Sequence, residues 1–216
     1  MGTTFPRTLV GLLLASVVSQ CLTAKAASFK LSFDPKNTCS AIEIKGAIKA
    51  GDYERFVTVL KQATASAPLR RIYLNSEGGQ VLTAIAITEV IRNTAPTVET
   101  IVQSRHICNS ACNIILTVGS THNVSRYATL KIHQTFDEET GKRDSALTKN
   151  IGQYLVTNGM PLDVLSTMRN LLPNEILTIT PSNAKRLGFG SFNFYGSIRP
   201  PATPQCSWKG ITQSGP

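Results

Sequence analysis

Between residues 41 and 134 the chain alternates short apolar runs with amphipathic stretches, and this alternation limits its fold more than any other feature. The apolar runs have the length and the β-branched or aromatic content of strands: residues 41–48, 71–75, 97–103 and 128–134. The stretches between them repeat with helical periodicity: residues 52–65, 80–93 and 110–118. This order is typical of right-handed crossovers over a mostly parallel sheet, so we expect an α/β fold.

The rest of the chain predicts a single domain with a short tail. Helical patterns recur in three further stretches: residues 145–158, 161–172 and 181–187. A strand-like run, FGSFNFYG, follows them, and 216 residues are enough for one well-packed core. From Arg199 onward the chain is rich in Pro, Ser, Gly and Thr, a composition typical of a loose terminus. We therefore expect a domain over residues 27–198 and a tail over residues 199–216.

The first residues have the features of a cleavable signal peptide. Arg7 supplies a basic start, and the mostly apolar residues 9–18 are too short to span a bilayer comfortably. A small-x-small cleavage site ends at Ala26, so we expect residues 1–26 to be removed. The product should be periplasmic or secreted, with no transmembrane segment. A lipid anchor on Cys21 ranks second, because the residue before it suits lipoprotein processing poorly.

The formal net charge of +9 is spread along the chain without a long basic run. Nucleic-acid-binding domains usually combine a basic stripe with aromatic side chains, and the sequence has no such stripe. We therefore expect no nucleic-acid partner.

Four of the five cysteines lie beyond the predicted signal peptide, where an oxidising compartment favours disulfides. We favour the local pair Cys108–Cys112, together with a pair Cys39–Cys206 that would tie the two ends of the domain together. The other pairings of these cysteines stay open. A zinc site is the alternative, from two histidines and two cysteines: His106, Cys108, Cys112 and His122. Their spacing is not that of a usual zinc module, so we expect no metal.

Three short motifs place reactive or permissive residues at the ends of expected strands. Gly78 and Gly79 lie between a strand and a helix, where glycines can present backbone N–H groups but more often only make a turn. Ser110 opens a helical stretch, a common place for a helix cap. His133 ends a strand, and a lone histidine is usually structural. Because neighbouring strand ends of a parallel sheet form one crevice, we expect these residues to meet in a site.

In this order the motifs resemble those of the Clp protease proteolytic subunit and its exported relatives. The resemblance covers residues 41–189 and rests on NSEGG, on a helix opened by Ser110 and Ala111, and on IHQ. It implies a ClpP/crotonase-like spiral of ββα units. It also implies that Ser110 is the nucleophile and His133 the general base. The N–H groups of Gly79 and Ala111 would form the oxyanion hole, and no cofactor is required.

The sequence departs from the family pattern in several places. Glu77 stands where the family usually has proline, and cysteines flank the serine. The aspartate expected as the third member of the triad is missing. Glu175 is the nearest candidate to orient the histidine, and Asn174 is the alternative. Asp137 and Asp144, in the loop after the histidine, are further candidates.

We therefore expect an exported Clp-like serine peptidase that hydrolyses peptides or unfolded proteins without a cytosolic ATPase, alone or as a homo-oligomer. A catalytically inactive Clp-like fold that serves as a periplasmic binding module is the alternative. Two other enzyme classes have related folds. A crotonase-type enzyme would need coenzyme A, which an exported protein does not meet. A serine/lysine protease would need a lysine beside Ser110, and Lys131 and Lys149 are the candidates.

Overall fold

The computed structural model describes residues 25–137, 140, 142–172, 175–184, 186–187, 192–196 and 206. Most of the expected signal peptide, residues 1–26, and most of the expected tail, residues 199–216, lie outside the described residues, and both remain predictions. In the described part of the chain, no helix is long and apolar enough to cross a bilayer.

The elements that the sequence predicts occur in the predicted order, and four further strands lie among them in the described part of the chain. The described strands are β1 (Ser28–Phe33), β2 (Ser40–Lys45), β3 (Leu69–Asn75), β4 (Glu99–Val102), β5 (Ile107–Asn109), β6 (Thr121–Ser125), β7 (Thr129–Ile132), β8 (Leu177–Ile179) and β9 (Phe192–Tyr195). The described helices are α1 (Asp52–Ser66), α2 (Val81–Thr94), α3 (Cys112–Leu116), α4 (Ser145–Thr157), α5 (Leu162–Asn170) and α6 (Pro181–Ala184).

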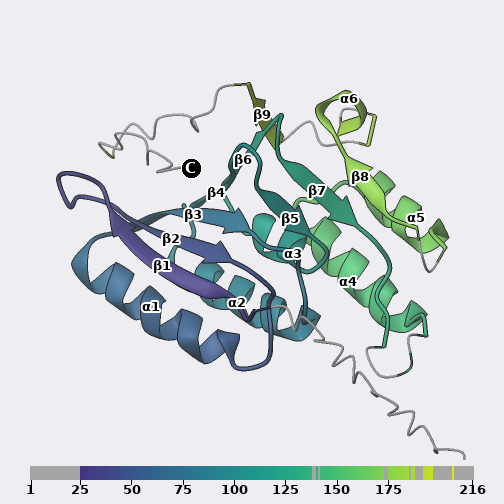
Figure 1. The fold of residues 1–216 in the computed structure, drawn as a ribbon, viewed down its shortest axis with the longest axis horizontal. Helices are drawn as coiled ribbons and strands as arrows, with labels where there is room; N and C mark the ends of the chain where they lie inside the picture. The colour runs from purple at the N-terminus through teal and green to yellow at the C-terminus, as the bar shows by residue number, and fades with distance from the viewer. Residues whose placement is uncertain are drawn as a thin grey trace, which may run out of the picture.

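The strands form two sheets. The larger sheet has the order β1-β2-β3-β4-β6-β9, in which β1 is antiparallel to β2 and every other neighbouring pair is parallel. The smaller sheet has the order β5-β7-β8, in which β5 and β7 are parallel and β8 is antiparallel to β7 (Figure 1). The predicted α/β fold with a mostly parallel sheet is confirmed.

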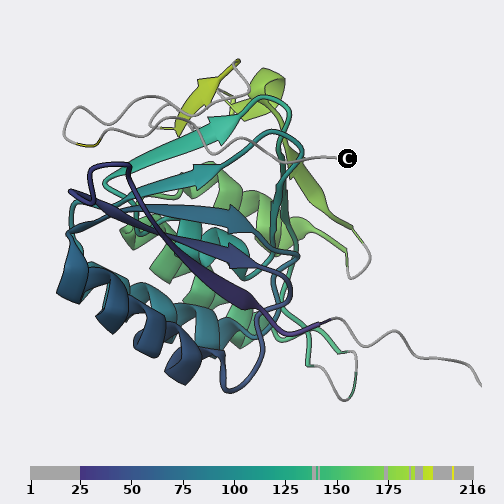
Figure 2. The ribbon, with the colours of Figure 1, turned by 60° about the vertical axis from the view of Figure 1, so that its left-hand side comes forward.

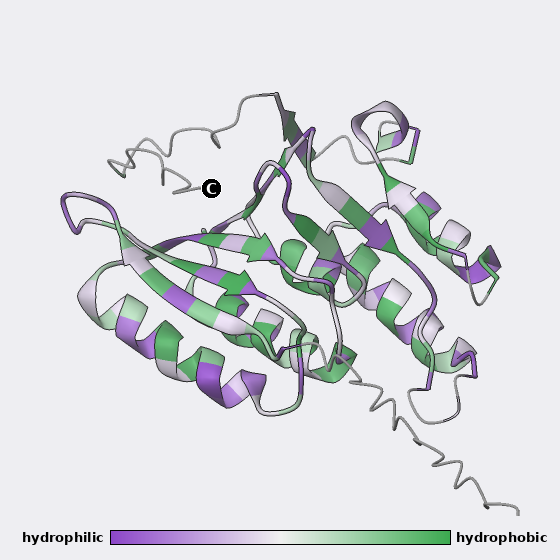
Figure 3. Ribbon diagram, in the orientation of Figure 1, coloured by the Kyte–Doolittle hydropathy of each residue, from purple (hydrophilic) through white to green (hydrophobic). Residues whose placement is uncertain are grey.

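Helices α1 and α2 lie on the same side of the larger sheet (Figure 1 and Figure 2). Phe56, Leu60 and Ala63 of α1 are buried in the same core as Ile72 and Leu74 of β3. Figure 3 shows hydrophilic and hydrophobic bands alternating along α1, as expected for a helix with one face against a sheet. Full burial of one such large apolar side chain stabilises the fold by about 1.5–3 kcal/mol.

The structure differs from the sequence prediction around the smaller sheet. The strand expected over residues 97–103 ends as β4 at Val102, and the chain turns through Arg105, whose φ is 63°, before β5 begins. The run expected over residues 128–134 is the shorter β7, and it joins β5 rather than the larger sheet. Strand β6 takes that place beside β4, although its segment, THNVS, has no strong apolar alternation.

Candidate active site

The three motifs meet in one cleft. Gly79, Ser110 and His133 all line a cavity of about 480 Å³ between the start of α2 and the end of β7. Ser110 and His133 also line a deeper recess of about 20 Å³, which leads toward α4 and α5. The structure therefore brings together the residues that the sequence analysis placed in a common site.

Ser110 lies on a sharp turn between β5 and α3. Its φ of 51° is in the left-handed region that residues other than glycine rarely adopt. The turn is held from two sides: the N–H of Ser110 donates to the carbonyl oxygen of Lys131 at 2.8 Å, and its carbonyl oxygen accepts from the N–H of Asn113 at 3.0 Å. Helix α3 starts only at Cys112 and has no side-chain cap, so Ser110 is not the helix cap considered as its alternative role.

Two glycines make room for this turn. Gly78 has a φ of 94°, and a Cβ atom on it would lie 2.5 Å from the carbonyl oxygen of Asn109 and 2.7 Å from the Cβ of Ser110. Gly79 has a φ of 135°, and a Cβ atom on it would lie 2.0 Å from the carbonyl oxygen of Ile48. Both positions therefore require glycine, and Gly78 is in direct contact with the serine turn.

Two backbone N–H groups at the cleft are candidates for an oxyanion hole. The carbonyl oxygen of Gly78 accepts from Ile48 N–H at 2.7 Å, and the N–H of Gln80 donates to Ile48 at 2.8 Å. These bonds fix the strand-like path on either side of Gly79 but leave its own N–H without an acceptor among the described residues. The N–H of Ala111 also has no acceptor there. Gly79 is exposed and lines the cleft, whereas Ala111 is buried and lines the deeper recess. Two unpaired donors on the walls of one site give it a capacity for an anionic oxygen.

His133 follows β7 and is half-buried. Its Nδ1 lies 2.5 Å from the carbonyl oxygen of Gln134, and its ring stacks on Phe136 with the ring centroids 5.9 Å apart. A carbonyl oxygen can only accept, so this bond requires the proton on Nδ1 and leaves Nε2 as an acceptor. Among the described residues no hydrogen bond joins His133 to Ser110, an arrangement that occurs in substrate-free sites.

The structure does not bring the expected third residue to His133. Glu175 is exposed, and its carboxylate accepts from the N–H of Leu172 at 2.7 Å. Its alternative, Asn174, lies outside the described residues. Asp144 caps α4 through Leu147 N–H, and Asp137 accepts from Thr140. Among the described residues, the polar partner of the histidine ring is thus a backbone carbonyl oxygen. Every residue has such an oxygen, so the sequence alone could not identify this partner.

Gln134, which the sequence analysis quoted in the IHQ motif without giving it a role, connects the strand end that carries His133 to α5. Its side chain is fully buried, and its Nε2 donates to the carbonyl oxygens of Arg169, at 3.2 Å, and Leu171. These contacts fix the peptide whose carbonyl oxygen holds the ring of His133. The signal in the sequence is its place in the IHQ motif, directly after an apolar strand.

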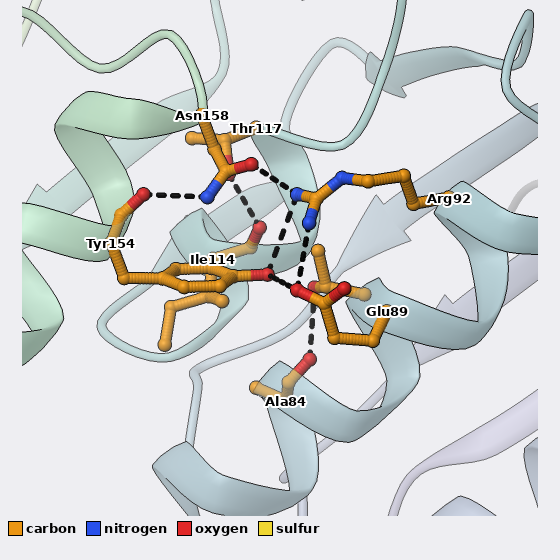
Figure 4. A network of polar contacts seen from close by, with 8 residues as sticks. Ala84, Glu89, Arg92, Ile114, Thr117, Tyr154 and Asn158 are labelled. Atoms are coloured by element: carbon orange, nitrogen blue, oxygen red, sulfur yellow. Dashed lines mark hydrogen bonds and ion pairs between the residues drawn. The ribbon is translucent and has the colours of Figure 1, made fainter.

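The helices that line the cleft are joined at their far ends. Leu147 near the start of α4 lines the cleft, as do residues at the start of α2. At the other ends, Arg92 and Glu89 of α2 meet Tyr154 of α4 and Asn158, the residue that follows this helix (Figure 4). The hydroxyl of Tyr154 donates to Glu89 at 2.7 Å, and burial, together with this hydrogen bond, raises the pKa of Tyr154 to about 12. The network fixes the spacing of the two helices.

Both favoured cysteine pairs are close enough for disulfides. The sulfur atoms of Cys108 and Cys112 are 2.04 Å apart, and those of Cys39 and Cys206 are 1.95 Å apart. Cys108 and Cys112 bracket the turn of Ser110 and are both fully buried. These two cysteines were also candidate ligands of the alternative zinc site, and their pairing with each other takes them from it. In the described part of the chain, no three His, Cys, Asp or Glu side chains are grouped so that they could hold a metal ion.

The lysines considered for a serine/lysine site lie elsewhere. Lys131 is on β7 and Lys149 is exposed on α4, and neither is among the residues that line the cleft. Lys131 takes part only through its backbone carbonyl, which holds the turn of Ser110 and the side-chain amide of Asn113.

The chain is similar to Clp protease subunits in both sequence and fold. A family model described as Clp protease matches residues 36–151. ClpP1 from Listeria monocytogenes superposes with a TM-score of 0.57 at 17% identity, over 73% of this chain and 91% of that one. The ClpP protease catalytic domain from Plasmodium falciparum superposes with a TM-score of 0.57 at 16% identity, over 78% of this chain and 90% of that one.

None of the curated proteins compared with the chain matches it in sequence. At 16–17% identity the structural neighbours establish the fold alone. The family match carries more weight, because it spans more than half of the 216 residues and includes the glycine pair, the serine turn and His133. The chain therefore belongs to the Clp protease family.

Proposed function

We propose that the protein is an exported serine peptidase that hydrolyses peptide bonds in peptides or unfolded proteins without a cytosolic ATPase. The observation that carries the proposal is the cleft itself, in which Ser110 sits on a left-handed turn beside two N–H groups without acceptors among the described residues. A serine held on a strained turn is costly to maintain and is typical of active sites. Backbone donors with no internal acceptor beside such a serine are typical of acyl-transfer sites. Membership of the Clp protease family supports the same reaction class.

The reaction would proceed through an acyl-enzyme. The hydroxyl oxygen of Ser110 attacks the peptide carbonyl carbon while Nε2 of His133 accepts the hydroxyl proton. The carbonyl oxygen of Gln134 keeps the imidazole in the required tautomer and stabilises the imidazolium that forms. His133 then gives the proton to the leaving amine, and a water molecule activated in the same way releases the second product.

The negative charge that develops on the substrate oxygen would be held by the N–H groups of Gly79 and Ala111. Loss of one such donor typically slows acyl transfer by about 10²–10³-fold. Because Gly79 and Ala111 are fixed by different segments, the oxyanion hole depends on the contact between the glycine pair and the serine turn.

Export is supported by two features. The segment 1–26 has the pattern of a signal peptide, and two cysteine pairs are close enough for disulfides. An oxidising compartment outside the cytoplasm supplies no ATP, so the peptidase would act on substrates that are already small or unfolded.

Degradation of a denatured protein by the purified mature chain, without nucleotide, tests this proposal. We expect new peptides, detected by mass spectrometry, from the wild type and none above background from Ser110→Ala. Cleavage by Ser110→Ala at the wild-type rate would show that the activity comes from a contaminating protease. Absence of cleavage by a folded wild type over a broad substrate set would favour the inactive binding module.

A further inference from the structure

The cleft beside Ser110 carries a single permanent charge. Among the described residues that line it, only Glu77 has a carboxylate or an ammonium or guanidinium group. The other lining side chains are apolar or neutral, and the apolar ones come from α2, from the segment after β7 and from α4: Val81, Leu82, Phe136 and Leu147. Leu82 is 72% exposed, which is unusual for leucine and leaves a large apolar surface at the cleft wall open to a ligand.

The carboxylate of Glu77 is not engaged elsewhere in the described part of the chain. No ion pair or hydrogen bond there involves it, whereas three other acidic side chains form ion pairs with arginine: Asp52, Glu89 and Glu99. Glu77 is also exposed. Its charge therefore faces the cleft without a neutralising partner among the described residues.

The backbone around Glu77 is held firmly, so its side chain cannot move far from the site. Ser76 is fully buried, and its N–H donates to Ile107 at 2.8 Å, while its carbonyl oxygen accepts from Asn109 at 3.0 Å. The N–H of Gly78 donates to the hydroxyl of Ser76 at 3.1 Å. Glu77 thus projects from a fixed loop only two positions before Gly79, whose N–H lies at the cleft.

A carboxylate next to an apolar wall fits a long cationic side chain. The methylene stem of lysine or arginine can cover Leu82 or Phe136 while its charged end reaches the carboxylate. An acidic side chain at the same place would be repelled. The chain as a whole has a formal charge of +9, which repels a cationic substrate. The attraction must therefore come from the nearby carboxylate of Glu77.

We propose that Glu77 is a specificity residue that selects substrates with a lysine or arginine side chain close to the scissile bond. This inference rests on the proposed peptidase function, because it identifies the cleft as the substrate site. It assigns a role to Glu77, which the sequence analysis noted as one departure from the family pattern.

Binding to Ser110→Ala tests the inference without the chemical step. Fluorescein-labelled peptide mixtures, randomised except for one central residue, would be titrated into this protein at low salt. We expect mixtures with central lysine or arginine to bind about two- to fivefold more tightly than those with glutamine, the range for one ion pair at an open site. Glu77→Gln, added to Ser110→Ala, should abolish the difference, and Glu77→Lys should favour central glutamate.

The matched control is Glu54→Gln, which removes an exposed carboxylate on α1 away from the cleft and should preserve the preference. Equal binding of the lysine and glutamine mixtures, or a preference that Glu77→Gln leaves intact, would overturn the inference. Because binding does not require a reactive serine, that result is separable from failure of the proposed hydrolysis. A protein that selects basic peptides but never cleaves them would support the inference and contradict the peptidase function.

Discussion

Ser110 and Gly78 depend on each other at the scale of single residues. The left-handed turn of the serine is possible only because no side chain stands on the glycine that it touches. A cost of about 1–3 kcal/mol is typical for a residue held in such a conformation, so the surrounding backbone bonds must supply it. Those bonds come from Lys131 and Asn113, on the strand and the helix that follow.

Gly78→Ala should therefore impair the site more than the fold. The added methyl would push against Asn109 and Ser110, so we expect fluorophosphonate labelling to fall at least about tenfold and stability to fall by about 1–3 kcal/mol. Gly51→Ala is the matched control: its φ of 83° is also left-handed, but nothing lies within 4 Å of the added methyl. Labelling rates and urea unfolding of both variants check this, and normal labelling of Gly78→Ala would contradict it.

The sequence identified the residues whose type carries information and missed those that act through the backbone. The sequence shows directly a glycine pair, a serine at a strand end and a histidine at the next strand end. The structure places these residues at one cleft. The partner of His133 is a carbonyl oxygen, which every residue possesses, so a search for an acidic third residue could not find it. Gln134 was missed because its role depends on a distant helix end.

At the scale of elements, local periodicity predicted the helices and strands but not how the strands are distributed between the sheets. The run before the serine divides into β4 and β5, and the run before His133 pairs with β5. The residues of an apolar run do not show which other strand it will pair with, because strand pairing depends on long-range packing. Helix α3 starts two residues later than expected, since the left-handed Ser110 cannot belong to a right-handed helix.

The contact between α2 and α4 is an element-level test of the cleft. Tyr154→Phe removes the hydroxyl that donates to Glu89 and accepts from Arg92, and leaves the ring in place (Figure 4). We expect the free energy of unfolding to fall by about 1–2 kcal/mol, as for a half-buried charge-assisted hydrogen bond. Urea unfolding measures this change. Tyr127→Phe, on an exposed tyrosine, should change nothing, and an equal loss in both variants would refute the role of the network.

Across the whole molecule, a disulfide between Cys39 and Cys206 would close a loop of 167 residues. In the chain-entropy description a loop of that length stabilises the folded state by roughly 5 kcal/mol. The short pair at the serine turn contributes less to global stability, because it closes only a few residues. Its consequence is local, since it braces the turn that carries Ser110.

Acid should destabilise the whole fold through His122, which is buried, and His106, which is half-buried. Burial lowers the pKa of His122 and of His106 below the ordinary 6.5, so the folded protein favours their neutral forms. The stability they contribute is present above pH 6.5 and is lost as the pH falls toward the folded pKa, by at most about 1.4 kcal/mol per histidine and pH unit.

His122→Phe isolates one of these groups, since phenylalanine can keep the stack on Phe192 without a titrating nitrogen. Urea unfolding above and below pH 6.5 should show a shallower loss of stability in the variant than in the wild type, with the remainder due to other groups such as His106. Equal slopes in the two proteins would show that His122 is not held in its neutral form.

The most direct test of the central claim, an activated serine in the cleft, is labelling of the purified mature protein by a fluorophosphonate. We predict labelling of the wild type, none in Ser110→Ala, and labelling slower by about 10²–10⁴-fold in His133→Ala, the usual contribution of a general base. Ser166→Ala, on the exposed side of α5, should label normally. A folded wild type that does not label, with or without reductant, or labelling that persists in Ser110→Ala, would contradict the account.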